Sequence, residues 1–162
     1  MAEPTSEAPL TINTQYVKDL SFENPGAPRI YVELSKRAPE ISVNFEVRQR
    51  QVTESAYEVV LAFKIDARIG EQAAFLVELE YAGLVSIGKA VSDSQRETLL
   101  LVEAPRHLFP FARTILAEAT RDGGFPPLML SPIDFNALHA KRKAEKADGN
   151  GPSVDQAPLG NA

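Results

Sequence analysis

The chain has 162 residues, no cysteine, and 17 Lys and Arg against 22 Asp and Glu, which gives a net charge of −5. This acidic balance argues against a protein that binds nucleic acid through a basic face. The absence of cysteine excludes disulfides, a thiol nucleophile and cysteine-ligated metal sites, and it fits a reducing compartment. No stretch approaches the roughly 18 apolar residues of a membrane span, and the acidic N-terminus lacks secretory-signal features. We therefore expect a soluble, cytoplasmic protein.

Both ends of the chain are polar and contain Pro or Gly, whereas the middle is apolar. Such ends cannot bury enough apolar surface to fold. The sequence therefore predicts disordered tails over 1–14 and 147–162, and one domain over 15–146.

The first half of this domain predicts β-strands. Apolar and polar residues alternate strictly over 57–69, clearly over 41–50 and 75–81, and more weakly over 16–22. Side chains alternate between the two faces of a strand, so each of these strands has one polar face. That pattern is typical of an antiparallel sheet with one face in water.

The connection between the first two strands, residues 24–40, is long for a loop inside a compact domain. It carries four apolar side chains that must cover something: Ile30, Tyr31, Val32 and Leu34.

The second half predicts helices. Residues 107–122 carry a wide apolar stripe, and Pro110 is expected to stand near the first turn of this helix. A proline-rich extended segment follows over 125–132. Asp134 is then expected to cap a short helix that runs to about residue 146.

The sequence offers little that could hold a cofactor or metal. The segment Gly83–Ala90 nearly matches a phosphate-binding loop, but Ala90 replaces the required hydroxyl residue and the interior is typical of a strand. His107 and His139 are far apart and fit no metal-ligand spacing. We expect no cofactor and no metal in this chain.

Two surfaces are open to more than one interpretation. Residues 51–80 contain six acidic and two basic residues, and Asp19 and Glu23 fall on one side of their strand. The sheet therefore carries either an acidic face in contact with water or a docking surface for a basic partner. The apolar connection, together with Phe135 and Leu138, either frames an apolar groove or covers the core.

Five blocks of the sequence, spread in order over about residues 10–140, resemble the SecB family of protein-export chaperones of Gram-negative bacteria. They are YVKDLSFENPGAP (16–28), YEVVL (57–61), AFLVE (74–78), LFPFAR (108–113) and GFPPLMLSPIDF (124–135).

The resemblance implies an α+β subunit with a four-stranded antiparallel sheet, a long crossover loop and two main C-terminal helices, assembled as a dimer of dimers. It implies an ATP-independent holdase, not an enzyme, that keeps secretory precursors unfolded and delivers them to the SecA translocase ATPase. The zinc-bearing C-terminal segment of SecA is then expected to dock on Asp19, Glu23, Leu76 and Glu78, with the zinc belonging to the partner. The client groove is expected on Ile30, Tyr31, Val32, Leu34, Phe135 and Leu138.

Two features differ from some relatives. The connection has Tyr31 where some relatives also carry a tryptophan, and the segment from Lys141 to Lys146 is basic where some have acidic tails. Two other classes of function stay open at this point. One is a small enzyme that uses carboxylates on the sheet, and the other is an adaptor that binds one folded partner through the acidic face.

Overall fold

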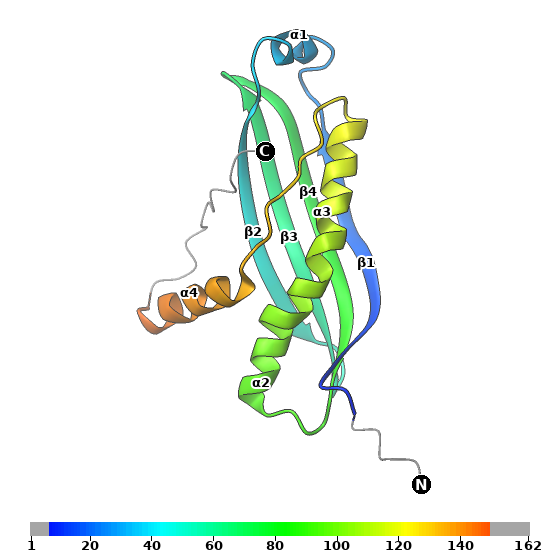
Figure 1. Ribbon diagram of the computed structural model, residues 1–162, viewed down its shortest axis with the longest axis vertical. Helices are drawn as coiled ribbons and strands as arrows, with labels where there is room; N and C mark the ends of the chain where they lie inside the picture. Colours follow the sequence, from blue (N-terminus) through cyan, green and yellow to red (C-terminus); the bar gives the residue numbers. More distant parts are fainter. Residues whose placement is uncertain (1–6, 150–162) are drawn as a thin grey trace.

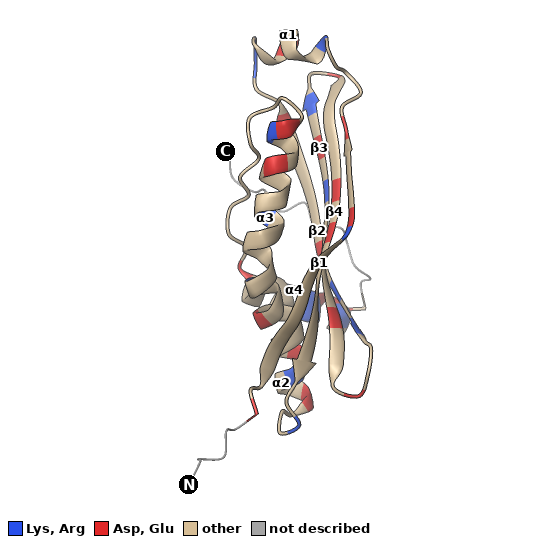
Figure 2. Cartoon of the chain, turned by 90° about the vertical axis from the view of Figure 1, so that its right-hand side faces the viewer, with Lys and Arg blue, Asp and Glu red and all other residues tan. Residues whose placement is uncertain are grey.

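The computed structural model describes residues 7–149, and within them one sheet of four antiparallel strands is covered on one face by helices (Figure 1). The strands follow the order β1 (Leu10–Glu23), β4 (Gln72–Ile87), β3 (Ala56–Ile69) and β2 (Glu40–Gln51), so β1 and β2 form the two edges. Turned by 90°, the described part of the molecule shows two layers, one formed by the sheet and the other by helices, of which α3 (Ala104–Asp122) is the longest (Figure 2).

The helical layer consists mainly of one long helical rod that lies along the sheet (Figure 1). The rod comprises three consecutive segments without a break: α2 (Asp93–Thr98), a π-helical turn η1 (Leu99–Glu103) and α3 (Ala104–Asp122). The short α1 (Ile30–Leu34) lies at one end of the sheet, and α4 (Phe135–Ala147) lies beside β2 and projects from the body. Among residues 7–149, no helix is both long and apolar enough to cross a membrane.

The core lies between the sheet and the rod. All seven apolar residues that alternate over 57–69 are buried there, as the sequence predicts. Gly83 on β4 allows α3 to come close, because a Cβ at this position would lie 3.0 Å from the Leu108 side chain. Thr120 fixes the next segment to the helix: its hydroxyl accepts a hydrogen bond from the Leu128 amide at 2.9 Å. The strands, the extended segment and the Asp134 cap are confirmed.

β1 contains two β-bulges, where its register against β4 shifts by one residue. One of them places Lys18 as an extra residue between Val17, which pairs with Tyr81, and Asp19, which pairs with Glu80. The side chains of Lys18 and Asp19 therefore both point to the uncovered face of the sheet, which we call the outer face.

Three expectations are corrected. β1 begins at Leu10, so the N-terminal tail expected over 1–14 is too long, because residues 10–14 pair with β4. The helix expected from His107 begins at Asp93, which leaves Pro110 in the interior of α3. The buried apolar side chains around this proline hold the helix together across it. The crossover expected as a loop contains α1. Of the C-terminal tail expected over 147–162, residues 150–162 lie outside the described part.

Candidate functional site

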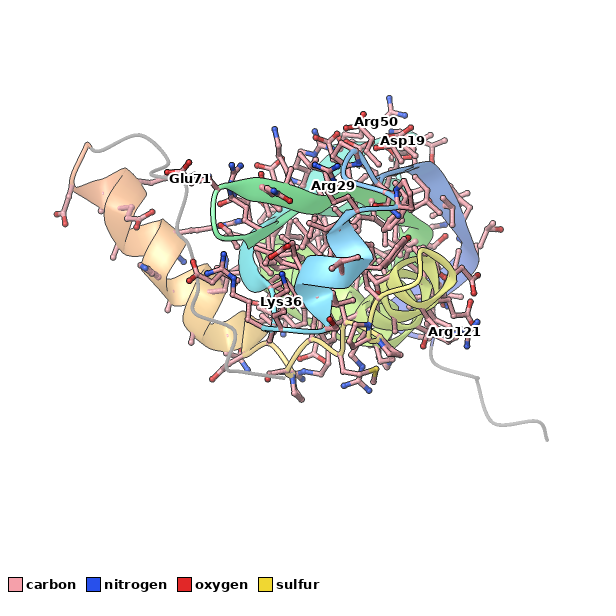
Figure 3. The ribbon with its side chains drawn as sticks, turned by 90° about the horizontal axis from the view of Figure 1, so that it is seen from above. Asp19, Arg29, Lys36, Arg50, Glu71 and Arg121 are labelled. Atoms are coloured by element: carbon pink, nitrogen blue, oxygen red, sulfur yellow. The ribbon has the colours of Figure 1, made fainter. Side chains whose placement is uncertain are left out.

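The four residues expected to dock SecA lie together on the outer face of β1 and β4. In the register of these strands Glu23 stands opposite Leu76, while Asp19 stands opposite Glu80, the next acid along β4 after Glu78. We call these five residues the acidic surface. Seen from above, Asp19 lies on the side of the sheet away from α3, whereas Arg121 of α3 lies on the helical side (Figure 3).

The acids of the two strands differ in their partners. On β4, Glu78 is paired with Lys64 of β3, with 3.6 Å between Nζ and Oε1, and Glu80 is paired with Arg48 of β2. On β1, neither Asp19 nor Glu23 takes part in any ion pair found among residues 7–149. The acidic surface therefore contains both neutralised and unneutralised carboxylates.

Another carboxylate on the outer face, that of Glu58, is buried. The Glu58 side chain is 6% exposed and accepts hydrogen bonds from Lys18 Nζ at 2.8 Å, Arg50 Nε at 2.9 Å and the Tyr16 hydroxyl. Arg50 stands directly opposite Glu58 on β2, while the other two donors reach from β1 across β4, where Ala82 leaves room for them. This Glu58 cluster links both edge strands of the sheet.

The Glu58 cluster shifts the pKa values of its members. The hydrogen bonds from Lys18 and then Tyr16 lower the pKa of Glu58 to about 2, because they favour its charged form. Burial, and then the hydrogen bond to Glu58, raise the pKa of Tyr16 to about 12. The sequence gives no sign of this cluster, since its residues come from three strands whose register only the fold determines.

The residues expected to line the client groove are not all at the surface. Ile30 is 0% exposed and Phe135 is 2% exposed, so both belong to the core and neither lines a groove in this conformation. Tyr31 packs on Phe125 and donates its hydroxyl to the Gly123 carbonyl at 2.7 Å, which ties the crossover to the end of α3.

Of the remaining groove residues, Leu34 and Leu138 are partly buried against the core, and Val32 is exposed. The structure also separates the two groups, since α1 lies at one end of the sheet and α4 farther along β2 (Figure 1). The crossover residues and the α4 residues expected to frame one groove therefore lie apart along the sheet. Tertiary packing decides which side of a short helix is buried, and the sequence pattern of five residues cannot show it.

Two exposed apolar residues that were not expected lie on the helical side of the molecule. Ile41 stands near the α1 end of β2 and is 40% exposed, and Met129 lies in the extended segment after α3 and is 52% exposed. The alternation of β2 already assigns Ile41 to the apolar face, but only the fold shows that α3 leaves this edge uncovered (Figure 1). Val32 of α1, Ile41 and Met129 are three exposed apolar residues from three separate segments, and we refer to this set as the apolar strip.

A further group of exposed apolar side chains lies at the opposite edge. Val17 and Leu20 of β1 point to the helical side of the sheet but are about half exposed, as is Phe111 of α3, whose ring stacks on Tyr81. β1 also pairs with a strand on one side only. An unpaired edge with apolar neighbours is a surface that a second chain can cover.

Comparisons with known proteins agree with this fold. The sequence model of the family described as Preprotein translocase subunit SecB matches residues 3–146. Two relatives named Protein-export protein SecB come from Paramagnetospirillum magneticum (48% identical; 88% of this chain and 91% of the relative) and Granulibacter bethesdensis (50% identical; 88% and 87%).

A solved structure with a similar fold is a Mycobacterium tuberculosis SecB-like chaperone in complex with a ChAD peptide from an antitoxin. It superposes with a TM-score of 0.63 over 76% of this chain and 90% of that chain, at 16% identity. The family match over most of the chain, supported by relatives about half identical in sequence, shows that the chain belongs to the SecB family of protein-export chaperones.

Proposed function

We propose that this chain is an ATP-independent holdase of the cytoplasm, which keeps secretory precursors unfolded and delivers them to the SecA translocase ATPase. Membership of the SecB family carries the proposal. The two faces of the sheet support it, because each offers a different kind of surface. The helical side has exposed apolar side chains, and the outer face has exposed carboxylates.

Unfolded clients are proposed to bind along the apolar strip of Val32, Ile41 and Met129. Apolar contacts are non-directional, so such a surface accepts many unfolded sequences and rejects native folds, whose apolar residues are hidden. Leu34 of α1 and Leu138 of α4 are half-buried against the core.

The client test uses a slow-folding precursor diluted from denaturant. The native protein is expected to hold it in a soluble complex without ATP, as measured by light scattering. Val32→Asp with Met129→Asp should lose most of this activity. Val52→Asp, a matched control at an exposed valine in the turn between β2 and β3, should keep it. An equal loss in all variants would contradict the assignment of the strip. Retention of a folded partner but of no unfolded precursor would favour an adaptor.

SecA is proposed to dock its zinc-bearing C-terminal segment on the acidic surface. A surface of exposed carboxylates around Leu76 fits a basic segment with an apolar contact at its centre. Asp19→Lys with Glu78→Lys should abolish SecA binding and spare client binding. Glu54→Lys with Glu71→Lys, which makes the same charge change at exposed positions in the two hairpin turns, should retain SecA binding. Unchanged SecA affinity in the first variant would refute this docking site.

A dimer of dimers is proposed as the assembly. The unpaired edge of β1 and the exposed side chains of Val17, Leu20 and Phe111 support it, because a second copy would bury them. Light scattering should give a mass near four subunits, and Leu20→Lys should lower it. A monomeric native protein would contradict the proposal.

A further inference from the structure

Each β4 carboxylate of the acidic surface is paired with one basic side chain, Glu78 with Lys64 of β3 and Glu80 with Arg48 of β2. Lys64 stands directly opposite Glu78 in the pairing of β3 with β4, so its amine has a carboxylate within reach without any special folding of the chain. Both side chains are more than half exposed, at 67% and 52%, and their atoms are 3.6 Å apart. This is the geometry of a weak, readily exchanged ion pair.

Arg48 reaches Glu80 from two strands away. The strand between them carries Ala62, which stands opposite Glu80 on β4 and opposite Glu46 on β2. Because this alanine is small, the Arg48 guanidinium lies across β3 and contacts both Glu80 and Glu46. The second acid of β4 is therefore held more firmly than Glu78.

We propose that Lys64 is a built-in competitor of the basic partner: it occupies Glu78 in the free protein and must leave when the partner binds. The inference rests on the proposed docking of a basic SecA segment on the acidic surface. Asp19 and Glu23 of β1 receive the partner first, because no ion pair in the described structure holds them. The partner then replaces Lys64 at Glu78. Because this ion pair must first be broken, the partner binds more weakly than it would to the same carboxylates without Lys64.

The size of the effect follows from the exposure of the pair. An exposed lysine–carboxylate pair changes an equilibrium by about two- to fivefold. Removing Lys64 should therefore tighten binding of the basic segment by about two- to fivefold at low salt, and salt should reduce this gain because it screens exposed charges. A holdase that must release its partner is well served by such a weakened contact.

A change of net charge could tighten binding in the same direction, so a control is needed. Arg68 supplies it, because it lies four residues farther along the same strand on the same face, and it donates to the Glu71 backbone carbonyl, not to an acid of the surface. Arg68→Gln changes the net charge as Lys64→Gln does and leaves Glu78 paired.

The experiment measures, by calorimetry with the full-length protein, the affinity for a synthetic zinc-loaded peptide of the SecA C-terminal segment. Lys64→Gln should bind about two- to fivefold more tightly, and Arg68→Gln should stay close to the native protein. In a Glu78→Gln background, Lys64→Gln should give no gain. A gain that is absent, equal in Arg68→Gln, or preserved without Glu78 would overturn the inference.

Failure of the docking site itself has a different signature. If Asp19→Asn and Glu78→Gln leave the peptide affinity unchanged, or if the native protein does not bind the peptide, the acidic surface is not the docking site, and the role of Lys64 falls with it. If these variants weaken binding while Lys64→Gln has no effect, docking stands and only the competitor role is refuted.

Discussion

Glu58 and Glu78 lie on the same face of the same sheet, and each is paired with a lysine, yet their surroundings differ. The Glu58 side chain is 6% exposed and has three donors, whereas Glu78 is 52% exposed and has one partner at 3.6 Å. Burial makes the first ion pair costly to break, and water makes the second easy to exchange. One face thus carries a fixed cluster that holds the strands and a replaceable pair where a partner is proposed to bind.

The largest expected effect on stability comes from removing the buried carboxylate, Glu58. Glu58→Ala should lower the free energy of unfolding by about 2–3 kcal/mol, because it leaves Lys18, Arg50 and the Tyr16 hydroxyl without their shared acceptor. Urea unfolding at one fixed protein concentration measures the change. Glu78→Ala, the matched control, should change it by less than about 0.5 kcal/mol. Equal effects would show that burial does not separate the two carboxylates.

Acid should weaken the same cluster step by step. The pKa of Glu58 lies at about 2, below its ordinary 4.5, so its contribution to stability is complete above pH 4.5 and is lost as the pH falls toward 2. The difference in unfolding free energy between the native protein and Glu58→Gln should therefore shrink between pH 4.5 and pH 3. A difference that stays constant over this range would contradict the shifted pKa.

A smaller effect is expected from the tyrosine. Tyr16→Phe should lower the free energy of unfolding by about 1 kcal/mol, since Glu58 keeps its two cationic partners. The pKa of Tyr16 is raised from 10 to about 12, so its contribution is full below pH 10 and is lost as the pH rises toward 12. The native protein should lose stability relative to Tyr16→Phe over that interval. Parallel alkaline unfolding curves would argue against the hydrogen bond.

The smallest effect on stability is expected at the exchangeable pair. Lys64→Gln should change the free energy of unfolding by less than about 0.5 kcal/mol, while it tightens binding of the basic peptide. Urea unfolding and calorimetry on the same preparation test both halves of the statement. A destabilisation as large as that of Glu58→Ala would mean that Lys64 holds the sheet and does not serve exchange.

The sheet was largely predictable from the sequence, because alternation is strict where one face is buried and the other is wet. β1 was the exception. Its bulges interrupt the alternation around Asn13 and Lys18, which explains why the pattern indicated only residues 16–22 of a strand that begins at Leu10. The start of the long rod at Asp93 was missed as well, because Pro105 and Pro110 are typical of a helix start and not of a helix interior.

That Asp19, Glu23, Leu76 and Glu78 lie together was predictable, and the strand register places them on one face. That SecA docks there stays a prediction. The client groove was not predictable. An apolar residue in the crossover either packs on the core or is exposed to a client, and the identity of the residue does not distinguish the two. Only packing shows that Ile30 belongs to the core and Val32 does not.

The bulge at Lys18 has a consequence for chain length. It lets β1 present two consecutive side chains on one face, Lys18 for the buried cluster and Asp19 for the acidic surface. A strand that lacked residue 18 would pair regularly and keep Asp19 and Glu23 on the outer face, but it would lose the lysine that reaches Glu58. A deletion at this point therefore preserves the alternation, so a relative with a gap here would lose one donor of the Glu58 cluster and keep the acids of the acidic surface aligned.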